Sequence, residues 1–404
     1  MDFNSKIRIA IISDPHFYQQ EKAQTPPSWL NINEMGDPQN LWKQLEDLIT
    51  KEQLSADVLL SLGDITTYAN SDALKVAWQS HVSLGEQMGC EILAAATGNH
   101  DVCSRPKEGA KSPREMEHAT DLFENLKQLD PCYPLHLYNK DNHKNAHTHR
   151  VHYFGADFVI YDDDERFRLV VLNSCARHTT EAKEHERGRI AASTISWLET
   201  ELEKFSDAPK KINIAMCHHS PIPLEDNNSG TYDVIHNGGI LLNHLNKCGD
   251  WVVCHGHKHF PKITHQNECF IFSSASLASC SVTADNQFYI LDIFLREEGG
   301  ISCTVNAWNW FERKGWEKAL SVKNGIWDGC GFGTKKHPEE IAKVISEISQ
   351  EFPVDWRFVR DQISDLKFIP PETFNKTNKV LNKKYNLNIV CNENGPVEVA
   401  RIMI

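Results

Sequence analysis

The chain has 404 residues, 40% of them hydrophobic and 24% charged, which is ordinary usage for a globular protein. This length can bury one large core, or one core with a small appendage. The formal net charge of −13 argues against nonspecific coating of nucleic acid, although a locally positive cleft is not excluded. The first residues lack the apolar segment of a signal peptide, and no run of about 18 apolar residues predicts a membrane span. The twelve cysteines show no CxxC spacing, so we expect reduced thiols and a cytoplasmic location.

Short apolar runs predict the strands of the fold, and they occupy residues 7–12, 57–62, 91–96, 167–172, 212–217 and 251–254. They are continuous rather than alternating, which is typical of strands covered on both faces. Helical patterns at 40–53 and 193–205 place apolar side chains on one face, and Ser193 is the expected N-cap of the second helix. Strands that alternate with helices predict an α/β architecture.

Two internal stretches interrupt this alternation. Residues 102–150 contain a helical pattern at 113–129 and then a His-rich segment at 141–152. We expect the His-rich segment to be a solvated loop near the cleft rather than an additional metal site. Residues 260–312 predict several further strands.

The composition changes beyond about residue 320, where a Gly-rich connector at 328–336 leads to a helix that begins at Pro338. We therefore expect a main domain over residues 1–320 and a mostly helical extension of unknown role over residues 321–404. The tryptophans of this region are expected to pack the extension onto the main domain, and they are Trp308, Trp310, Trp316 and Trp327.

Carboxylate, amide and imidazole side chains follow five of the apolar runs. They are Asp14 and His16 in "SDPHF", Asp64 in "GDITTY", Asn99, His100 and Asp101 in "TGNHD", His218 and His219 in "HHSP", and His257 and His259 in "HGHKH". Each fragment alone is a common turn or cap. Because the carboxyl ends of strands share one edge of an α/β sheet, five such fragments at strand ends predict one common site.

These residue types suit borderline divalent or trivalent metal ions, namely Mn, Fe, Zn, Co or Ni. Two ions about 3.5–4 Å apart need one bridging carboxylate and several terminal ligands. Such a pair polarises an ester oxygen and generates hydroxide at neutral pH, and a phosphoryl centre is its natural electrophile.

The ordered set DxH, GD, GNHD, HH and GHxH, between about residues 6 and 300, resembles the calcineurin-like metallophosphoesterase superfamily. The resemblance implies a four-layer α/β/β/α sandwich of two mixed sheets flanked by helices. It also implies a hydrolase in which a metal-bridging hydroxide attacks phosphorus in line. The ligands that it implies are Asp14, His16, Asp64 and His259 for one metal, and Asp64, Asn99, His218 and His257 for the other.

Three further residues of these motifs have expected roles. By the same resemblance, His100 contacts the phosphate and protonates the leaving group, and Asp101 orients His100. We expect an extended backbone over 256–259, which would turn both histidines to the same side. His255 then remains a buried or hydrogen-bonded supporting residue.

Departures from related patterns narrow the substrate class. Purple acid phosphatases have glycine where this chain has His16, and a tyrosine where it has Thr67. Phosphoprotein phosphatases carry arginines beside the second and third motifs, which this sequence lacks. The chain is therefore most similar to the cyclic-nucleotide-phosphodiesterase-like and nuclease-like branches, and without an arginine clamp a dianionic monoester is less favoured.

The sequence accordingly predicts a metal-dependent phosphodiesterase that acts on small or cyclic nucleotide-type diesters and has no membrane association. One alternative is a nuclease on DNA or RNA, for which a basic rim would be formed by Lys107, Lys111, Arg114, Lys140, Lys144 and Arg150. A second alternative is a regulatory protein whose extension binds a protein partner. Trp29, in a loop that should face the substrate, has two interpretations, which are packing and stacking on a base.

Overall fold

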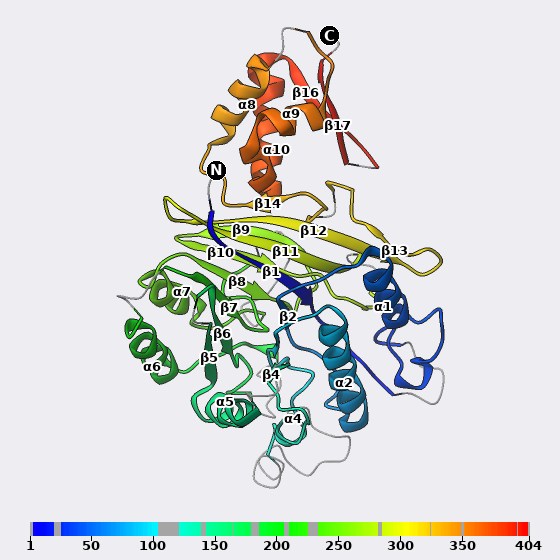
Figure 1. The fold of residues 1–404 in the computed structure, drawn as a ribbon, viewed down its shortest axis with the longest axis vertical. Helices are drawn as coiled ribbons and strands as arrows, with labels where there is room; N and C mark the ends of the chain where they lie inside the picture. Colours follow the sequence, from blue (N-terminus) through cyan, green and yellow to red (C-terminus); the bar gives the residue numbers. More distant parts are fainter. Residues whose placement is uncertain are drawn as a thin grey trace.

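In the computed structural model, the residues described are 3–19, 26–103, 121–138, 143–163, 165–178, 186–205, 210–224, 233–281, 285–323, 325–348, 351–393 and 395–402. Two mixed β-sheets pack against each other through contacts of β1 and β11 with β7. Helices lie on the outer sides of both sheets (Figure 1). The expected sandwich of two mixed sheets and flanking helices is confirmed.

The large sheet has the strand order β13-β12-β11-β1-β2-β3-β4, with β14 paired to β12. Its strands are β1 (Phe3–Ile12), β2 (Val58–Ser61), β3 (Ile92–Ala95), β4 (Leu135–Leu137), β11 (Asn286–Arg296), β12 (Ile301–Phe311), β13 (Gly315–Lys318) and β14 (Gly331–Phe332). β1, β2 and β3 are parallel because helices α1 (Leu41–Glu52) and α2 (Ser71–Gln87) return the chain between them. Their carboxyl ends therefore lie at one edge of the sheet.

The smaller sheet has the strand order β5-β6-β7-β8-β10-β9. Its strands are β5 (Phe158–Asp162), β6 (Phe167–Leu172), β7 (Ile212–Met216), β8 (Trp251–His255), β9 (Lys262–Gln266) and β10 (Cys269–Ser273). β6, β7 and β8 are parallel, and α6 (Ala192–Glu203) and α7 (Gly238–Asn246) connect them. All six predicted strands are confirmed, three in each sheet.

The local sequence accounts for the helices that cover the sheets. Asn40 caps α1 by accepting a hydrogen bond from the amide of Trp42, and the helix buries Leu41, Leu45, Leu48 and Ile49. The prediction of Ser193 as an N-cap is wrong, because α6 begins at Ala192 and its cap position, Ala191, has no side chain able to bond. Within the described residues, no helix is both long enough and apolar enough to cross a membrane.

The expected solvated loop is wrong for residues 143–152, because they belong to helix α5 (His143–Ala156), which contacts β4 and β5. Residues 141 and 142 lie outside the described residues. Ala146 and Tyr153 lie seven residues apart on its buried side. Arg150 donates to the carbonyl oxygens of Lys127 and Tyr133, which fixes the helix to the segment before β4. Of the helix expected at 113–129, residues 113–120 lie outside the described residues, and the rest includes the short helix α4 (Glu124–Lys127).

The extension forms a separate lobe beyond the edge of the large sheet (Figure 1). Its elements are α8 (Pro338–Glu347), β15 (Val354–Asp355), α9 (Trp356–Gln362), a 3-10 helix (Ser364–Phe368), α10 (Pro371–Val380), a π-helical turn (Leu381–Tyr385), β16 (Leu387–Asn392) and β17 (Gly395–Arg401). The three strands pair in the order β15-β17-β16. As predicted, α8 begins at Pro338, and it buries Ile341 and Ile345 against α10.

The four tryptophans pack against two different parts of the structure. Trp327 packs on Phe374 of α10, with ring centroids 5.3 Å apart, so it joins the main body to the extension as expected. For the other three the expectation is wrong: the indole nitrogens of Trp308, Trp310 and Trp316 donate to α1, at Glu52, Gln44 and Leu41. Because β14 still belongs to the large sheet, we propose that the extension begins after it, close to residue 335.

Candidate metal centre

The predicted ligands stand directly after five parallel strands. Asp14 and His16 follow β1, Asp64 follows β2 and Asn99 follows β3, all in the large sheet, and the other three follow strands of the smaller sheet, with His218 after β7 and His257 and His259 after β8. The seven side chains therefore meet where the carboxyl edges of the two packed sheets adjoin. Asp14 and His218 are fully buried, and Asp64 and Asn99 are 2% exposed.

One group of ligand atoms surrounds a single point. His16 Nε2 lies 3.7 Å from Asp64 Oδ2 and 3.3 Å from His259 Nε2. His259 Nε2 in turn lies 3.4 Å from Asp14 Oδ1. Nitrogen and oxygen ligands about 2.0–2.2 Å from one ion are separated by roughly 3–3.5 Å from each other. The four side chains thus fit one metal ion after only small movements.

A second group uses the same carboxylate. His218 Nε2 lies 3.4 Å from Asp64 Oδ2 and 3.1 Å from Asn99 Oδ1. The ring of His257 stands 5.1 Å from that of His218, and the buried Nε2 of His257 has no hydrogen-bond partner within the described part of the chain. Asp64 Oδ2 therefore lies between the two groups, in the place required of a bridging ligand.

The hydrogen bonding of His218 indicates that a cation belongs beside it. Its Nδ1 donates to the carbonyl oxygen of Leu62 at 2.9 Å, so Nε2 is the ring nitrogen directed at Asp64. Burial lowers the pKa of His218, but the negative charges of Asp64 and Asp14 raise it to about 9. Two carboxylates and an imidazole lone pair that converge in this way require a proton or a metal ion between them.

His100 and Asp101 lie at the rim of this centre. The His100 ring is half-buried, 4.9 Å from the His16 ring, and its backbone amide donates to Asp64 Oδ1 at 2.7 Å. Both oxygens of Asp101 accept backbone hydrogen bonds at 2.9 Å, from Thr66 and Gly98. Burial and the charge of Asp64 raise the pKa of Asp101 to about 7. These contacts of Asp101 fasten the second motif to the third.

Most of the predicted ligands have an unusual, left-handed backbone conformation. Five of the seven predicted ligands have a positive φ, namely Asp14 (49°), His16 (51°), Asp64 (50°), His257 (78°) and His259 (53°). Such conformations cost about 1 kcal/mol or more per residue and persist only where the surroundings impose them. The prediction of an extended backbone over 256–259 is therefore wrong, because left-handed turns at both histidines bring their rings into the centre.

Glycines next to the ligands allow the strand ends to approach. A Cβ atom on Gly98 would lie 2.0 Å from the amide nitrogen of Asp64, and one on Gly256 would lie 2.3 Å from Asp14 Oδ2. A Cβ on Gly63 would lie 2.8 Å from His218 Nδ1. Each glycine precedes one ligand and touches the motif of another, so its missing side chain leaves the space that the ligand cluster needs.

Comparison with known families agrees with this geometry. The family model of the calcineurin-like phosphoesterases matches residues 7–261. The chain belongs to the calcineurin-like phosphoesterase family. None of the curated protein sequences matches the chain.

Solved structures show a distant likeness in fold. A provisionally assigned 5'-nucleotidase from Staphylococcus aureus is 14% identical (TM-score 0.40, covering 74% of this chain and 54% of that one). The purple acid phosphatase PPD1 from yellow lupin is also 14% identical (TM-score 0.41, 75% and 51%). The protein TT1561 from Thermus thermophilus is 13% identical (TM-score 0.37, 71% and 95%). The chain spans about half the length of the first two, and at these TM-scores the likeness carries no argument about activity.

His219 is a buried neighbour of the centre to which the sequence assigned no role. Its ring lies 4.4 Å from that of His257, and its Nδ1 lies 2.9 Å from Ser174 Oγ. Ser174 follows β6, a sixth strand end that contributes to the surroundings of the candidate metal centre. The signal was the segment "NSC" directly after the apolar run 167–172. His255 is fully buried, with its Nδ1 3.1 Å from the carbonyl oxygen of Gly256, which confirms the expected supporting position.

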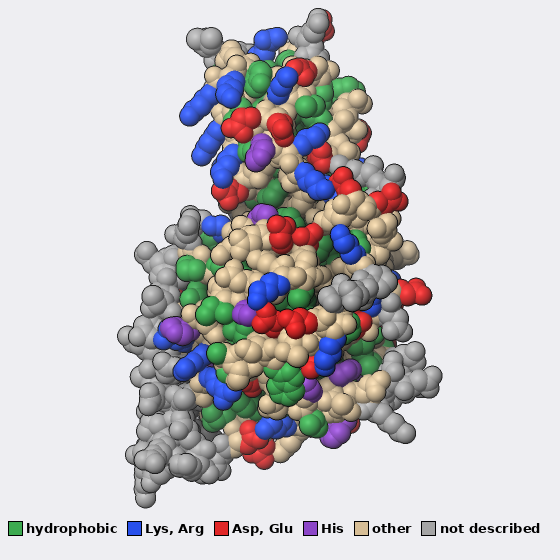
Figure 2. Space-filling model, turned by 90° about the vertical axis from the view of Figure 1, so that its left-hand side faces the viewer, with side chains coloured by type: hydrophobic (Ala, Val, Ile, Leu, Met, Phe, Trp, Pro, Cys, Tyr) green, Lys and Arg blue, Asp and Glu red, His purple; other side chains and the backbone are tan. Residues whose placement is uncertain are grey.

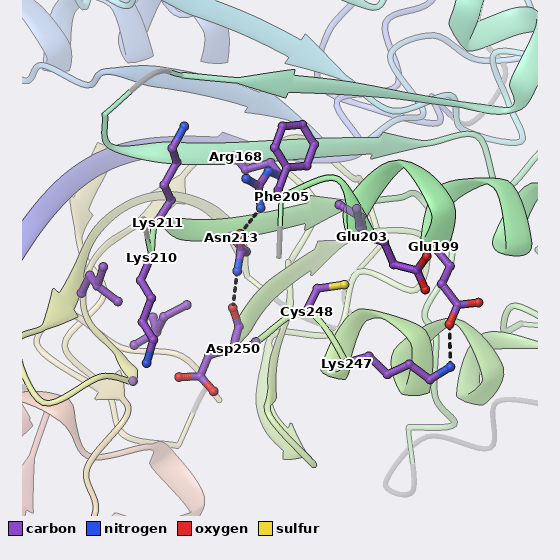
Figure 3. A pocket seen from close by; sticks show the side chains of 15 residues that line it. Arg168, Glu199, Glu203, Phe205, Lys210, Lys211, Asn213, Lys247, Cys248 and Asp250 are labelled. Carbon is purple, nitrogen blue, oxygen red and sulfur yellow. Dashed lines mark hydrogen bonds and ion pairs between the residues drawn. The ribbon is translucent and has the colours of Figure 1, made fainter. Parts of the chain in front are cut away.

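A different hollow lies at the opposite ends of β6 and β7, where these strands begin (Figure 3). Its volume is about 410 Å³, and Arg168, Lys211 and Asn213 are among the residues that line it. Arg168 Nε and Lys211 Nζ both bind Asp162, at 2.9 and 3.0 Å, and the guanidinium also covers the ring of Phe205 at 4.0 Å. None of the predicted metal ligands lines this hollow.

Proposed function

We propose that this calcineurin-like phosphoesterase is a dinuclear-metal-dependent phosphodiesterase that acts on small or cyclic nucleotide-type diesters. The observation that supports it is the convergence of two ligand groups on Asp64. The donor set of carboxylate, amide and imidazole fits Mn, Fe, Zn, Co or Ni. Two bound ions would polarise the phosphoryl oxygens and lower the pKa of a coordinated water.

The chain's own residues supply the remaining chemistry. His100 would donate a proton to the leaving oxygen, since its ring nitrogen lies within 4.8 Å of the ligand atoms of His16 and Asp64. The amide of His100 holds Asp64 Oδ1, which leaves Oδ2 directed at both metal positions. Asp101 would act as a positioning residue through its bonds to Thr66 and Gly98.

The charge of the site favours a diester over a monoester. Lys258 is the one cationic residue within the five motifs, and its Nζ lies 3.0 Å from Asp233 Oδ1. A monoester carries nearly two negative charges at neutral pH and gains most from a bidentate arginine, which the second and third motifs do not contain. A diester has a single charge, which the two metal positions would balance.

The alternatives have less support. Of the basic residues expected to serve a nuclease, Arg150 is bound to backbone carbonyl oxygens next to β4. The described part of the chain does not include Lys107, Lys111, Arg114, Lys140 or the side chain of Lys144. On the face in Figure 2, side chains of both charge signs are present on the main body and on the extension. A role for the extension in binding a protein partner remains a second proposal, for which the packed lobe after β14 offers a surface. The twelve free thiols accord with a reducing, cytoplasmic setting, which we also propose.

The test compares kcat/KM of the Mn²⁺-loaded full chain for bis(4-nitrophenyl) phosphate, 4-nitrophenyl phosphate, a cyclic nucleotide and a DNA duplex at two salt concentrations. We expect metal-dependent hydrolysis that is fastest with the small diesters. A preference for the monoester would overturn the diester proposal. Duplex cleavage that falls steeply with salt would establish the nuclease instead.

A further inference from the structure

Two adjoining hollows share the lining residues Trp29, Trp310 and Glu312. Their volumes are about 690 and 360 Å³, which together suit a small organic ligand. Phe260, which lines the larger hollow, directly follows the ligand His259. The residue before Trp29 is bound to the first motif, because Ser28 Oγ donates to the carbonyl oxygen of Pro15 at 2.8 Å. The groove is therefore built on segments that are continuous with the motif of His259 or hydrogen-bonded to the motif of Asp14.

The groove presents aromatic surface to solvent. Trp29 is 38% exposed and Phe311 is 39% exposed. The rings of Trp29 and Trp310 stand 5.2 Å apart at 54°, and the indole nitrogen of Trp310 donates to Gln44 at 2.7 Å. The backbone amide of Trp29 donates to Ala278 at 2.9 Å, so the exposed ring is held on an ordered loop.

The groove is also acidic. The charged residues that line the two hollows are the carboxylates Glu34, Asp37, Asp285 and Glu312 and the cations Arg313 and Lys323. Four carboxylates against two cations leave a formal excess of two negative charges. Cys280 and Glu312 both line the larger hollow, and burial together with the charge of Glu312 raises the pKa of the Cys280 thiol to about 11.

We propose that this groove, defined by Trp29, Trp310, Phe311, Asp285 and Glu312, binds a cationic substituent of the phosphodiester substrate, such as an amine or a quaternary ammonium group. Aromatic faces attract a cation through the ring quadrupole, and the carboxylates add a Coulombic attraction. The same charges repel a second phosphate, so the groove selects against polyphosphates and long nucleic acids. This inference rests on the proposed phosphodiesterase function, because it assigns the substituent attached to the phosphoryl group.

The experiment uses three 4-nitrophenyl phosphodiesters with the full-length, Mn²⁺-loaded protein. Their second alcohols are choline, its uncharged isostere 3,3-dimethylbutanol, and an anionic hydroxy acid of similar size. We expect kcat/KM to be about 2- to 30-fold higher for the cationic diester than for its uncharged isostere, the range expected for a cation on an aromatic face. The anionic diester should be the poorest substrate, and the differences should shrink in high salt.

Variants separate the groove from the metal centre. Glu312→Gln and Trp29→Leu should each reduce the ratio of cationic to uncharged kcat/KM toward one. Trp197→Leu is the matched control, since Trp197 is 46% exposed on α6 and lines neither hollow, and it should keep the wild-type ratio. Both test positions are exposed, so thermal melts should show folded proteins.

Direct binding of tetramethylammonium, followed by tryptophan fluorescence, gives a readout that needs no catalysis. Binding that weakens in Trp29→Leu and Glu312→Gln, but not in Trp197→Leu, would support the groove even if none of the diesters were hydrolysed, in which case only the proposed function would fail. Hydrolysis of all three diesters at equal rates, together with no binding of tetramethylammonium, would overturn the groove and leave the proposed function intact.

Discussion

Replacing Gly256 by alanine tests whether the close approach of the strand ends builds the site. A Cβ atom at this position would lie 2.2 Å from Ser13 Oγ and 2.3 Å from Asp14 Oδ2, whereas ordinary contact begins near 3.4 Å. Asp14 would have to move by about 1 Å, and a displacement of that size in a catalytic group costs about 10²-fold in rate. The carboxylate cannot yield easily, because both of its oxygens also accept the amide of His257, at 3.1 and 3.2 Å.

The expected result is a folded protein that has lost much of its affinity for one metal ion and about 10²-fold in kcat/KM. Overpacking should also lower the free energy of unfolding by about 1–3 kcal/mol. The assay is metal content by elemental analysis together with hydrolysis of a small diester. Gly239→Ala is the matched control, because Gly239 lies in α7 and a Cβ there would have nothing within 4 Å. Wild-type metal content and activity in Gly256→Ala would refute the reasoning.

Four further outcomes are expected. Asp64→Asn should lower kcat by roughly 10³-fold or more and reduce the bound metal, measured by kinetics and elemental analysis, because both ligand groups share this carboxylate. His100→Ala should slow esters with poor leaving groups by about 10²–10⁴-fold in a leaving-group series and spare those that depart unprotonated. Truncation near residue 335 should leave metal binding intact but lower the Tm, because Trp327 loses its packing on Phe374. Burial raises the pKa of Asp292, but its bonds to Arg8 and Lys6 lower the pKa by a larger amount, so that the pKa lies below its ordinary value. The stabilisation from Asp292 should therefore be complete above its unfolded pKa of about 3.9 and be lost as the pH falls through the lower folded value, in chemical denaturation at a series of pH values.

Each of these four predictions would be contradicted by a particular result. Full activity of Asp64→Asn in the presence of a chelator would exclude the bridging role. Equal losses across the leaving-group series would assign His100 to phosphate binding or to structure. A folded truncated protein without metal would show that the extension builds the site. Unchanged acid stability in Asp292→Asn would mean that the ion pairs of this carboxylate contribute nothing to folding.

The sequence determined the ligand motifs and the strands that carry them, because both signals are local. A continuous apolar run such as 57–62 predicts a buried strand by itself, and the polar residue that follows it, Asp64, marks the strand end. The order of the five motifs identified the family. The position of α8 could also be predicted, because Pro338 is suited to a first helical turn and the apolar residues Ile341 and Ile345 recur with helical spacing.

Only the tertiary structure decided how these pieces meet. The strands before Asp64 and His218 belong to different sheets, and strand pairing between distant segments has no signature within either run. The positive φ at His257 and His259 is imposed by contacts with the first motif, against local preference, so alternation along the chain predicted the wrong backbone. Trp308 likewise binds α1 rather than the extension, because α1 packs against the β12–β13 end of the sheet. The local sequence pattern determines which residues can act as ligands, whereas packing between distant segments determines where their side chains point.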